Sequence, residues 1–144
     1  MKVRSLRALT EPARLVDQPV VAANYERVPS ACPAARTLVA GALRAWGLAD
    51  LTDADLVLSE LVSNAIRHAE GDGMRVTALR LSGRRVRIGV IDRGRGRPTV
   101  QALTADGESG RGMWLVASLS AAWGVQVLPG GKCVWSEMEG PWRA

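Results

Sequence analysis

Residues 55–69 read DLVLSELVSNAIRHA, and this stretch decides the fold. Its apolar residues recur at the three- and four-residue spacing of a helix, which gives the helix one buried stripe. The stripe consists of Leu58, Leu61, Val62, Ala65, Ile66 and Ala69. Thr52 and Asp55 form a T-x-x-D capping pattern ahead of the apolar run, so the helix is predicted to begin there.

Two polar residues lie at the edge of this stripe. Glu60 and Asn64 are four positions apart, so their side chains share one flank of the helix. At the floor of a pocket, the carboxylate could orient or deprotonate a nucleophile, and the amide oxygen could bind Mg²⁺. An amphipathic helix with two ordinary polar residues at its boundary explains the same pattern, and the stretch alone does not decide between these interpretations.

The composition is that of one globular domain. The chain has 144 residues, of which 47% are apolar and 23% charged, and no apolar run is long enough to span a membrane. We expect residues 1–19 to form a basic, poorly ordered extension and residues 20–144 to form the domain. Cys32 and Cys133 lack metal or redox spacing, which indicates free thiols in a cytoplasmic protein.

The net charge of +5 comes almost entirely from arginine. The arginines gather between Arg80 and Arg97 and again at Arg111, without aromatic stacking residues among them, and the chain has no Phe and a single Tyr. A positive field of this kind suits a polyphosphate ligand or an acidic partner as well as it suits DNA. A nucleic-acid function therefore rests on the arginines alone.

The remaining pattern predicts strands and helices on both sides of the organising helix. Periodicity and turn residues give the expected boundaries. They are a strand within 18–28, a helix over 30–46 ended by Gly47, a hairpin of 74–81 and 84–91, a helix that opens at 110–112 and is closed by Gly124, and a hairpin of 125–128 and 132–138.

An acidic residue follows the strand over 84–91. Period two puts Asp92 on the same face as the apolar Val86, Ile88 and Val90, and burial of an unpaired carboxylate is costly. A ligand with donor groups would offset that cost, and so would a solvent-exposed strand end. Gly94 and Gly96 come next; they would let the backbone bend sharply and approach a flat ligand, although a simple turn has the same pattern.

Residues 97–109 show no sustained periodicity and are expected to form a functional or mobile loop. The loop leads to Gly110-Arg111-Gly112 at the predicted helix start. Free amides and the helix dipole favour phosphate at such a position, and a flexible entry to a helix is the plainer alternative.

Taken in order, these motifs resemble the Bergerat-fold (GHKL) ATPases, which include histidine kinase catalytic domains, gyrase-type ATPases, heat-shock chaperones and mismatch-repair ATPases. The resemblance runs from Val21 to about Met138. The stretches SELVSNAIRHA and GRGMWLV look most like the stand-alone bacterial anti-sigma factor kinases of the RsbW and SpoIIAB type. The resemblance implies an α+β fold: a two-layer α/β sandwich in which helices cover one face of a mixed, mostly antiparallel sheet.

The resemblance also implies roles for the polar residues of the first two motifs. Asp92 would accept a hydrogen bond from the adenine amino group, with Gly94 and Gly96 keeping the backbone close to the base. Asn64 would hold Mg²⁺ against the phosphates of ATP, and Glu60 would act as the general base on the attacking serine hydroxyl or water.

At the last glycine motif, Gly110 and Gly112 would bind phosphate oxygens through their amides, with Arg111 as a further phosphate contact. The sequence departs from the family pattern at two places. Glu108 stands where kinase members tend to have a basic residue, and Cys133 stands where a threonine usually supports the adenine through water. Both departures bear on catalysis more than on nucleotide binding.

The function implied is that of an ATP-dependent serine/threonine-protein kinase and anti-sigma factor. Such a protein sequesters a sigma factor and transfers the γ-phosphate of ATP to a serine of a STAS-domain anti-sigma-factor antagonist. It would be a cytoplasmic homodimer without membrane or nucleic-acid contacts. The alternative is a regulatory module that uses nucleotide as a switch without phosphoryl transfer. A histidine kinase fragment is disfavoured because no phosphoacceptor helix hairpin accompanies the domain.

Overall fold

The computed structural model describes residues 20–68, 71, 73–82, 84–93 and 107–144, with the backbone alone from 107 to 111. These residues form one five-stranded sheet and three helices. In chain order the elements are β1 (Val20–Glu26), α3 (Ala31–Trp46), α4 (Thr52–His68), β2 (Gly73–Leu81), β3 (Arg85–Asp92), α6 (Gly107–Leu119), β4 (Ala122–Leu128) and β5 (Gly131–Met138).

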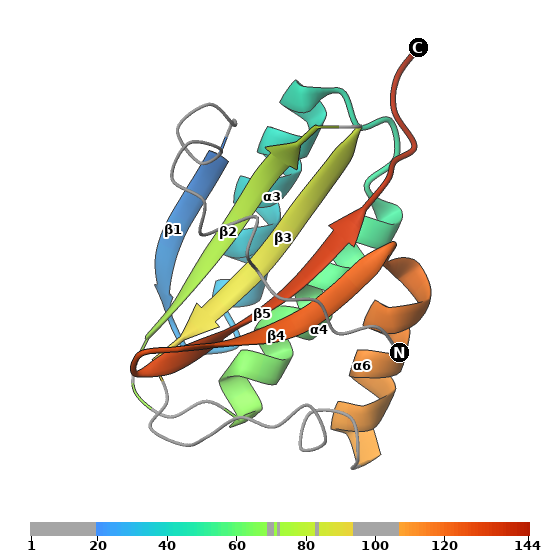
Figure 1. Cartoon of the computed structure of the whole chain (residues 1–144). Coiled ribbons are helices and arrows are strands. Elements are labelled where there is room, and N and C mark those ends of the chain that lie inside the picture. The colour runs from blue at the N-terminus through green and yellow to red at the C-terminus, as the bar shows by residue number, and fades with distance from the viewer. Residues whose placement is uncertain (1–19, 69–70, 72, 83, 94–106) are drawn as a thin grey trace.

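The sheet has the strand order β1-β2-β3-β5-β4, and every pairing within it is antiparallel. All three helices lie behind the same face of the sheet in Figure 1. The predicted α+β fold with helices on one face is therefore confirmed. The sheet is, however, wholly antiparallel among the described strands and not mixed, because each hairpin joins neighbouring strands directly and β5 returns between β3 and β4.

The core lies between the sheet and the helices. Strand alternation directs every second residue of β3 toward α4, and Val86, Ile88 and Val90 are each at most 1% exposed. From α4 the apolar stripe predicted by the sequence packs against them. Its fully buried members are Leu58, Leu61 and Val62, and Val57, which the prediction did not include, is fully buried beside them. This packing fixes which flank of α4 faces the sheet, and so it fixes the positions of the polar residues at the edge of the stripe.

The predicted start of α4 at Thr52 is confirmed, but the group that caps the helix differs from the prediction. The helix begins at Thr52 itself, and the carboxylate of Asp50 accepts hydrogen bonds from the Thr52 backbone N–H (2.9 Å) and hydroxyl (2.7 Å). These bonds lower the pKa of Asp50. The T-x-x-D pattern is therefore not the cap, because the nearer Asp50 already satisfies the first free amide of the helix.

The α6–β4 region also differs from the prediction. Helix α6 begins at Gly107, three residues before Gly110, and ends at Leu119, so the predicted loop over 97–109 gives way to helix for its last three residues. Gly124 does not close the helix; it lies in β4 opposite Trp135 of β5. A glycine there leaves room for the large indole, and Gly89 of β3 is the facing residue on the other side.

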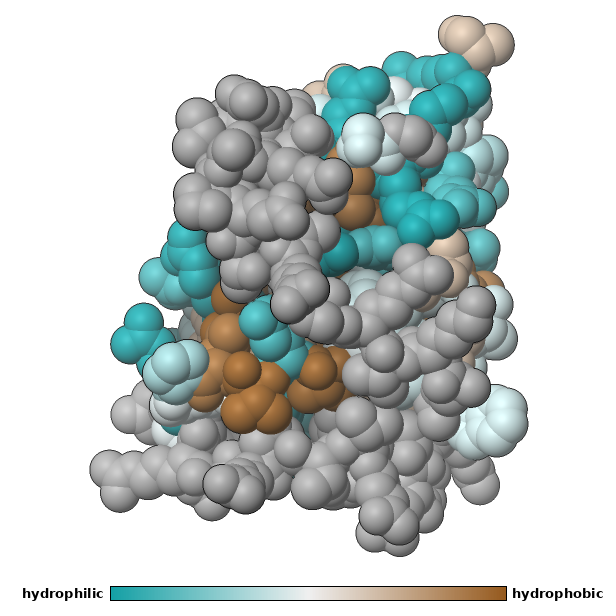
Figure 2. Space-filling view, in the orientation of Figure 1, coloured by the Kyte–Doolittle hydropathy of each residue, from teal (hydrophilic) through white to brown (hydrophobic). Residues whose placement is uncertain are grey.

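The face of the sheet that points away from the helices carries a second, smaller cluster. Cys133, Trp135 and Ala122 are buried there, and the Arg87 guanidinium lies 4.6 Å from the centre of the Trp135 ring. In Figure 2, which looks onto this face, hydrophobic residues gather toward the β4–β5 turn and hydrophilic residues toward the opposite end of the sheet. None of the described helices is long and apolar enough to cross a membrane.

Candidate active site

Asn64 is the most informative residue of the predicted site. It lies in α4 with 2% of its surface exposed, and neither its Oδ1 nor its Nδ2 atom has a hydrogen-bond partner among the residues that the structure describes. An unsatisfied buried polar group costs about 1–3 kcal/mol. Buried polar atoms in proteins are otherwise nearly always paired, so this amide indicates a place for a ligand or bound water.

Glu60 lies one helical turn before Asn64 and is brought against α6. A Cβ atom built at Gly112 would overlap the Oε2 atom of Glu60, so in the observed conformation the Glu60 carboxylate lies against Gly112. The structure therefore brings together the predicted general base and the last glycine of the G-x-G motif, which are far apart in the sequence.

Asp92 ends β3 on the face that points to the helices, as predicted, and is 1% exposed. Its Oδ2 atom forms an ion pair of 2.7 Å with the ammonium of Lys132, which is itself 6% exposed. The two residues are register partners on β3 and β5. A Cβ at Gly131 would overlap the Asp92 carbonyl oxygen, so this glycine lets the start of β5 lie close to the end of β3.

The end of α4 lies near this ion pair. Helix α4 packs on both β3 and β5. The pKa of His68, the last residue of α4, is lowered by burial first and then by the charges of Arg67 and Lys132. Arg27 secures this end of the helix, since its guanidinium donates to the carbonyls of Ala65 and Ile66 (3.1 Å each). The helix bearing Glu60 and Asn64 and the strands bearing Asp92 and Lys132 therefore converge.

Cys133 is not part of this group. Strand alternation turns it to the opposite face of the sheet, where it packs with Trp135 and Ile91. Burial raises the pKa of its thiol to about 12. The expectation that Cys133 takes the place of the adenine-supporting threonine is thus wrong, because the residue of β5 that faces Asp92 is one position earlier.

That residue, Lys132, was missed by the sequence interpretation. The signal was available: in an antiparallel pair, a residue opposite Asp92 shares its face, and Lys132 alternates with Val134 and Ser136 on β5. What the sequence did not supply was the register of β5 against β3, because that register depends on the close approach at Gly131.

The glycine motifs are only partly described. Gly110, Arg111 and Gly112 lie in the fourth to sixth positions of α6, and among them only the Gly110 amide belongs to the four free N–H groups of the first turn. Gly94, Gly96 and the expected extension over residues 1–19 fall outside the described residues, as do the side chains of Glu108 and Arg111. Phosphate binding by this motif stays a prediction.

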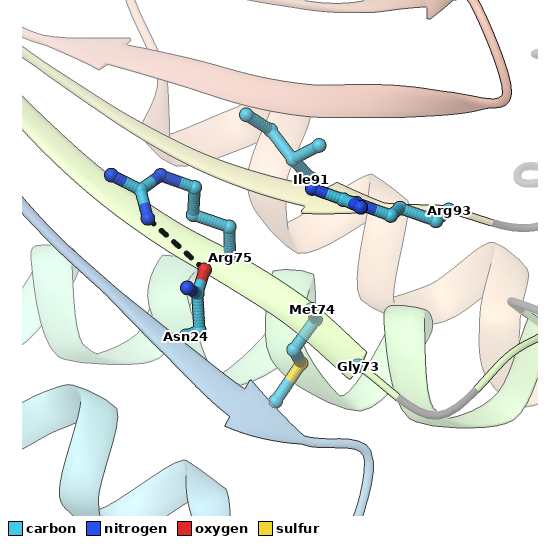
Figure 3. A pocket seen from close by; sticks show the side chains of 6 residues that line it. All are labelled: Asn24, Gly73, Met74, Arg75, Ile91 and Arg93. Carbon is cyan, nitrogen blue, oxygen red and sulfur yellow. Dashed lines mark hydrogen bonds between the residues drawn. The ribbon is translucent and has the colours of Figure 1, made fainter.

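A separate pocket of about 480 Å³ lies at the ends of β1, β2 and β3. Figure 3 shows its lining, in which the Arg75 guanidinium donates to the Asn24 side-chain oxygen (3.0 Å). The other lining residues are Gly73, Met74, Ile91 and Arg93. None of the predicted site residues that the structure describes is among its lining residues, and Ile91 points to the face of β3 opposite Asp92.

The converging groups suit a nucleotide and a hard cation. Asp92 and Lys132 offer an acceptor and a donor side by side, Asn64 offers an unpaired amide, and Glu60 offers a carboxylate at the start of α6. Among the described residues no group of three or more His, Cys, Asp or Glu side chains could hold a metal. A cation at this site would therefore need ligands from its own bound partner in addition to Asn64.

Comparisons with known proteins agree with this fold. The model of the histidine kinase-like ATPase domain matches residues 21–137. The fold also matches the solved structure of the RsbU and RsbW domains of Rv1364c from Mycobacterium tuberculosis, with a TM-score of 0.66 and 22% identity over 87% of this chain and 34% of that one.

A weaker likeness is to the histidine kinase domain of the blue-light activated histidine kinase EL346 from Erythrobacter litoralis. Its TM-score is 0.49 and its identity 28%, over 60% of this chain and 43% of that one. This chain thus spans about a third of the first structure and less than half of the second. No curated protein matches it significantly. The family model covers most of the sequence, and the chain belongs to the histidine kinase-like ATPase family.

Proposed function

We propose that this protein is a cytoplasmic, ATP-binding anti-sigma factor with serine/threonine-protein kinase activity. It sequesters a sigma factor and transfers the γ-phosphate of ATP to a serine of a STAS-domain antagonist. The observation that carries the proposal is the buried amide of Asn64, whose two polar atoms are both unpaired in a family of ATP-binding domains.

Each residue of the site has a role in this proposal. Asp92 accepts from the amino group of adenine, with Gly94 and Gly96 supporting the base, and Gly110, Arg111 and Gly112 contact the phosphates. Asn64 contributes an oxygen ligand to Mg²⁺. When bound, the ion neutralises charge that develops on the phosphoryl group.

Glu60 acts as the general base in the proposed reaction. Its carboxylate accepts the proton of the serine hydroxyl as that oxygen attacks phosphorus, and ADP leaves with the bond to the γ-phosphoryl group broken. The position of the Glu60 carboxylate against Gly112 supports this role, because the carboxylate lies beside the motif expected to bind phosphate. Positioning of this kind supplies much of the catalysis in phosphoryl transfer.

The direct test is phosphoryl transfer to the antagonist. Purified protein, Mg-ATP and the cognate antagonist are mixed, and phosphoserine is measured by mass spectrometry. Glu60→Gln should reduce transfer by about 100-fold or more while ATP binding persists, as expected for loss of a general base. Asp53→Asn is a matched control, because Asp53 is an exposed acid on the same helix. Absence of transfer by the unmodified protein, with ATP binding intact, would contradict the kinase proposal.

A second candidate is a nucleotide-dependent binding module without phosphoryl transfer. The observation that favours it is the start of α6 at Gly107, since the amides of Arg111 and Gly112 then lie within the helix and not at its free end. The two candidate functions predict different results in cells for Glu60→Ala. If Glu60→Ala leaves control of the sigma factor unchanged, the module is supported; if control is lost, the kinase is supported.

A further inference from the structure

Lys132 lies in the candidate site but has no role in the proposed function. Its side chain is 6% exposed, although lysine is rarely buried unless it is paired, and its ammonium contacts the carboxylate of Asp92 at 2.7 Å. Burial of a lysine costs several kcal/mol before any attraction is counted. A buried Lys–Asp pair of this kind gives weak evidence of a gain in stability, so another role is worth seeking.

The two side chains reach the same point from neighbouring strands. Asp92 is the last residue of β3 and Lys132 the second residue of β5, and they are direct register partners on the helix-facing side of the sheet. Figure 1 shows the adjacent ends of β3 and β5. Because β3 and β5 lie in the interior of the strand order, both strands hold the pair in place.

The pair presents complementary hydrogen-bonding groups. A carboxylate only accepts, and an ammonium only donates, through three N–H groups. In the described part of the chain Asp92 is the one ion-pair partner of Lys132, which leaves the ammonium further donors. An acceptor and a donor side by side match the Watson–Crick edge of adenine, where the amino group donates and the neighbouring ring nitrogen N1 accepts.

We propose that Lys132 is a specificity-determining residue of the nucleotide site and donates a hydrogen bond to N1 of the adenine whose amino group Asp92 binds. This inference rests on the proposed function, since it requires that Asp92 contact the base. The lysine then acts twice: it holds one oxygen of Asp92, and it binds a second atom of the same base edge. A site that binds adenine through N1 penalises an analogue without that acceptor, because the buried ammonium loses a partner.

The test compares ATP with 1-deaza-ATP, in which a C–H group replaces N1. Both are titrated into the protein in a calorimeter with magnesium present. The unmodified protein should bind ATP about tenfold or more tightly than 1-deaza-ATP, the effect of one hydrogen bond to a charged group. Lys132→Met should bind the two nucleotides equally. Lys132→Arg, which retains the charge and the donors, should restore part of the preference.

Two further variants separate the contact from general effects. Arg36→Met removes a positive charge from an exposed site on α3. This variant should leave the ratio of the affinities for ATP and 1-deaza-ATP unchanged. If Lys132→Met does not fold because Asp92 loses its partner, the comparison is made between Asp92→Asn and Asp92→Asn/Lys132→Met. The single variant should keep the preference for ATP, and the double variant, whose neutral pair carries no unpaired charge, should lose it.

The outcomes separate the two proposals. Failure of the unmodified protein to bind ATP contradicts the proposed function itself. ATP binding with the same ratio to 1-deaza-ATP in Lys132→Met, or tighter ATP binding in that variant, overturns the role of Lys132 and leaves the function standing. Binding of GTP as tightly as ATP also overturns it, because the ammonium would then serve the 6-oxo group of guanine and not N1 of adenine.

Discussion

Two buried ion pairs join the same two strands on opposite faces of the sheet. Arg87 and Glu137 pair on the face away from the helices, and Asp92 and Lys132 pair on the face toward them. On the far face Arg87 donates to Glu137 from both Nε (2.7 Å) and Nη2, and Arg85 reaches the second carboxylate oxygen (3.1 Å). On the near face the pair lies near the end of α4, the helix that carries Asn64, whose side-chain atoms have no hydrogen-bond partner among the described residues.

The difference separates structure from function. On the far face both oxygens of the Glu137 carboxylate have cationic partners, although Arg87 Nη1 and Trp135 Nε1 are buried without a hydrogen-bond partner among the described residues. The near side keeps a buried amide unsatisfied at a cost to the folded state, which native proteins accept mainly where a ligand later supplies the partner. Neither a buried charge nor a single unsatisfied atom therefore marks the site; Asn64 differs because both polar atoms of its side chain lack a hydrogen-bond partner among the described residues.

The largest loss of stability is expected from a substitution on the far face. Glu137→Ala leaves the guanidinium of Arg87 buried without its counter-charge, and loss of one partner from a buried pair costs about 3–5 kcal/mol. Urea unfolding of the variant measures this loss. Glu139→Ala is the control, because Glu139 pairs with Arg85 from an exposed position (62%) and such pairs contribute about 1 kcal/mol or less. Equal losses in the two variants would show that the far pair is not a closed structural unit.

A smaller change in the free energy of unfolding, of opposite sign, is expected from a substitution on the near face. Asn64→Leu removes the unsatisfied amide and keeps the volume, so the free energy of unfolding should stay unchanged or rise by about 1 kcal/mol. The same variant should make nucleotide binding insensitive to magnesium. Asn24→Leu is the control, because that amide already accepts a hydrogen bond from Arg75 and should lose a little stability. A loss above about 2 kcal/mol in Asn64→Leu would mean that the amide is structural.

The sequence predicted the two faces of the molecule unequally. Helix α4 and the helix-facing residues of β3 follow from periods of 3.6 and two, so Asn64 and Asp92 could be expected on the inner face. Cys133 was placed on the wrong face and Lys132 was missed, because the register of β5 depends on the contact between Gly131 and the Asp92 carbonyl. The far-face cluster was not predicted at all: Arg87 and Glu137 look like ordinary exposed charges until the strands are paired.

The starts of helices are likewise hard to predict from the sequence. The periodicity fixes the middle of α6, but Gly110 looks like its first residue only if glycine is taken as a boundary signal. The structure begins the helix at Gly107, three residues before that signal. Local signals of this kind compete, and tertiary contact between α6 and Glu60 of α4 supplies information that no local pattern carries.

The smallest expected effect is a shift in the pKa of His68, and it tests whether α4 and β5 meet at the site. The pKa of His68 is lowered chiefly by burial and further by the charges of Arg67 and Lys132, so Lys132→Met should raise it part of the way toward 6.5. Since His68 is the one histidine in the chain, NMR titration of its ring protons measures this without ambiguity. Arg36→Met, which removes a charge from the exposed side of α3, should leave the pKa of His68 unchanged.

The sign of the linkage follows from the lowered pKa. The folded protein binds this proton less readily than the unfolded chain, so the contribution of His68 to stability is fully present above pH 6.5 and is lost as the pH falls through 6.5 toward the lower folded value. Lys132→Met should weaken this pH dependence of unfolding. If the variant shifts neither the NMR titration nor the pH dependence, Lys132 does not lie beside the end of α4. Asn64 and Asp92 would then belong to different sites, because α4 and β5 would no longer be joined at the point where the nucleotide is expected.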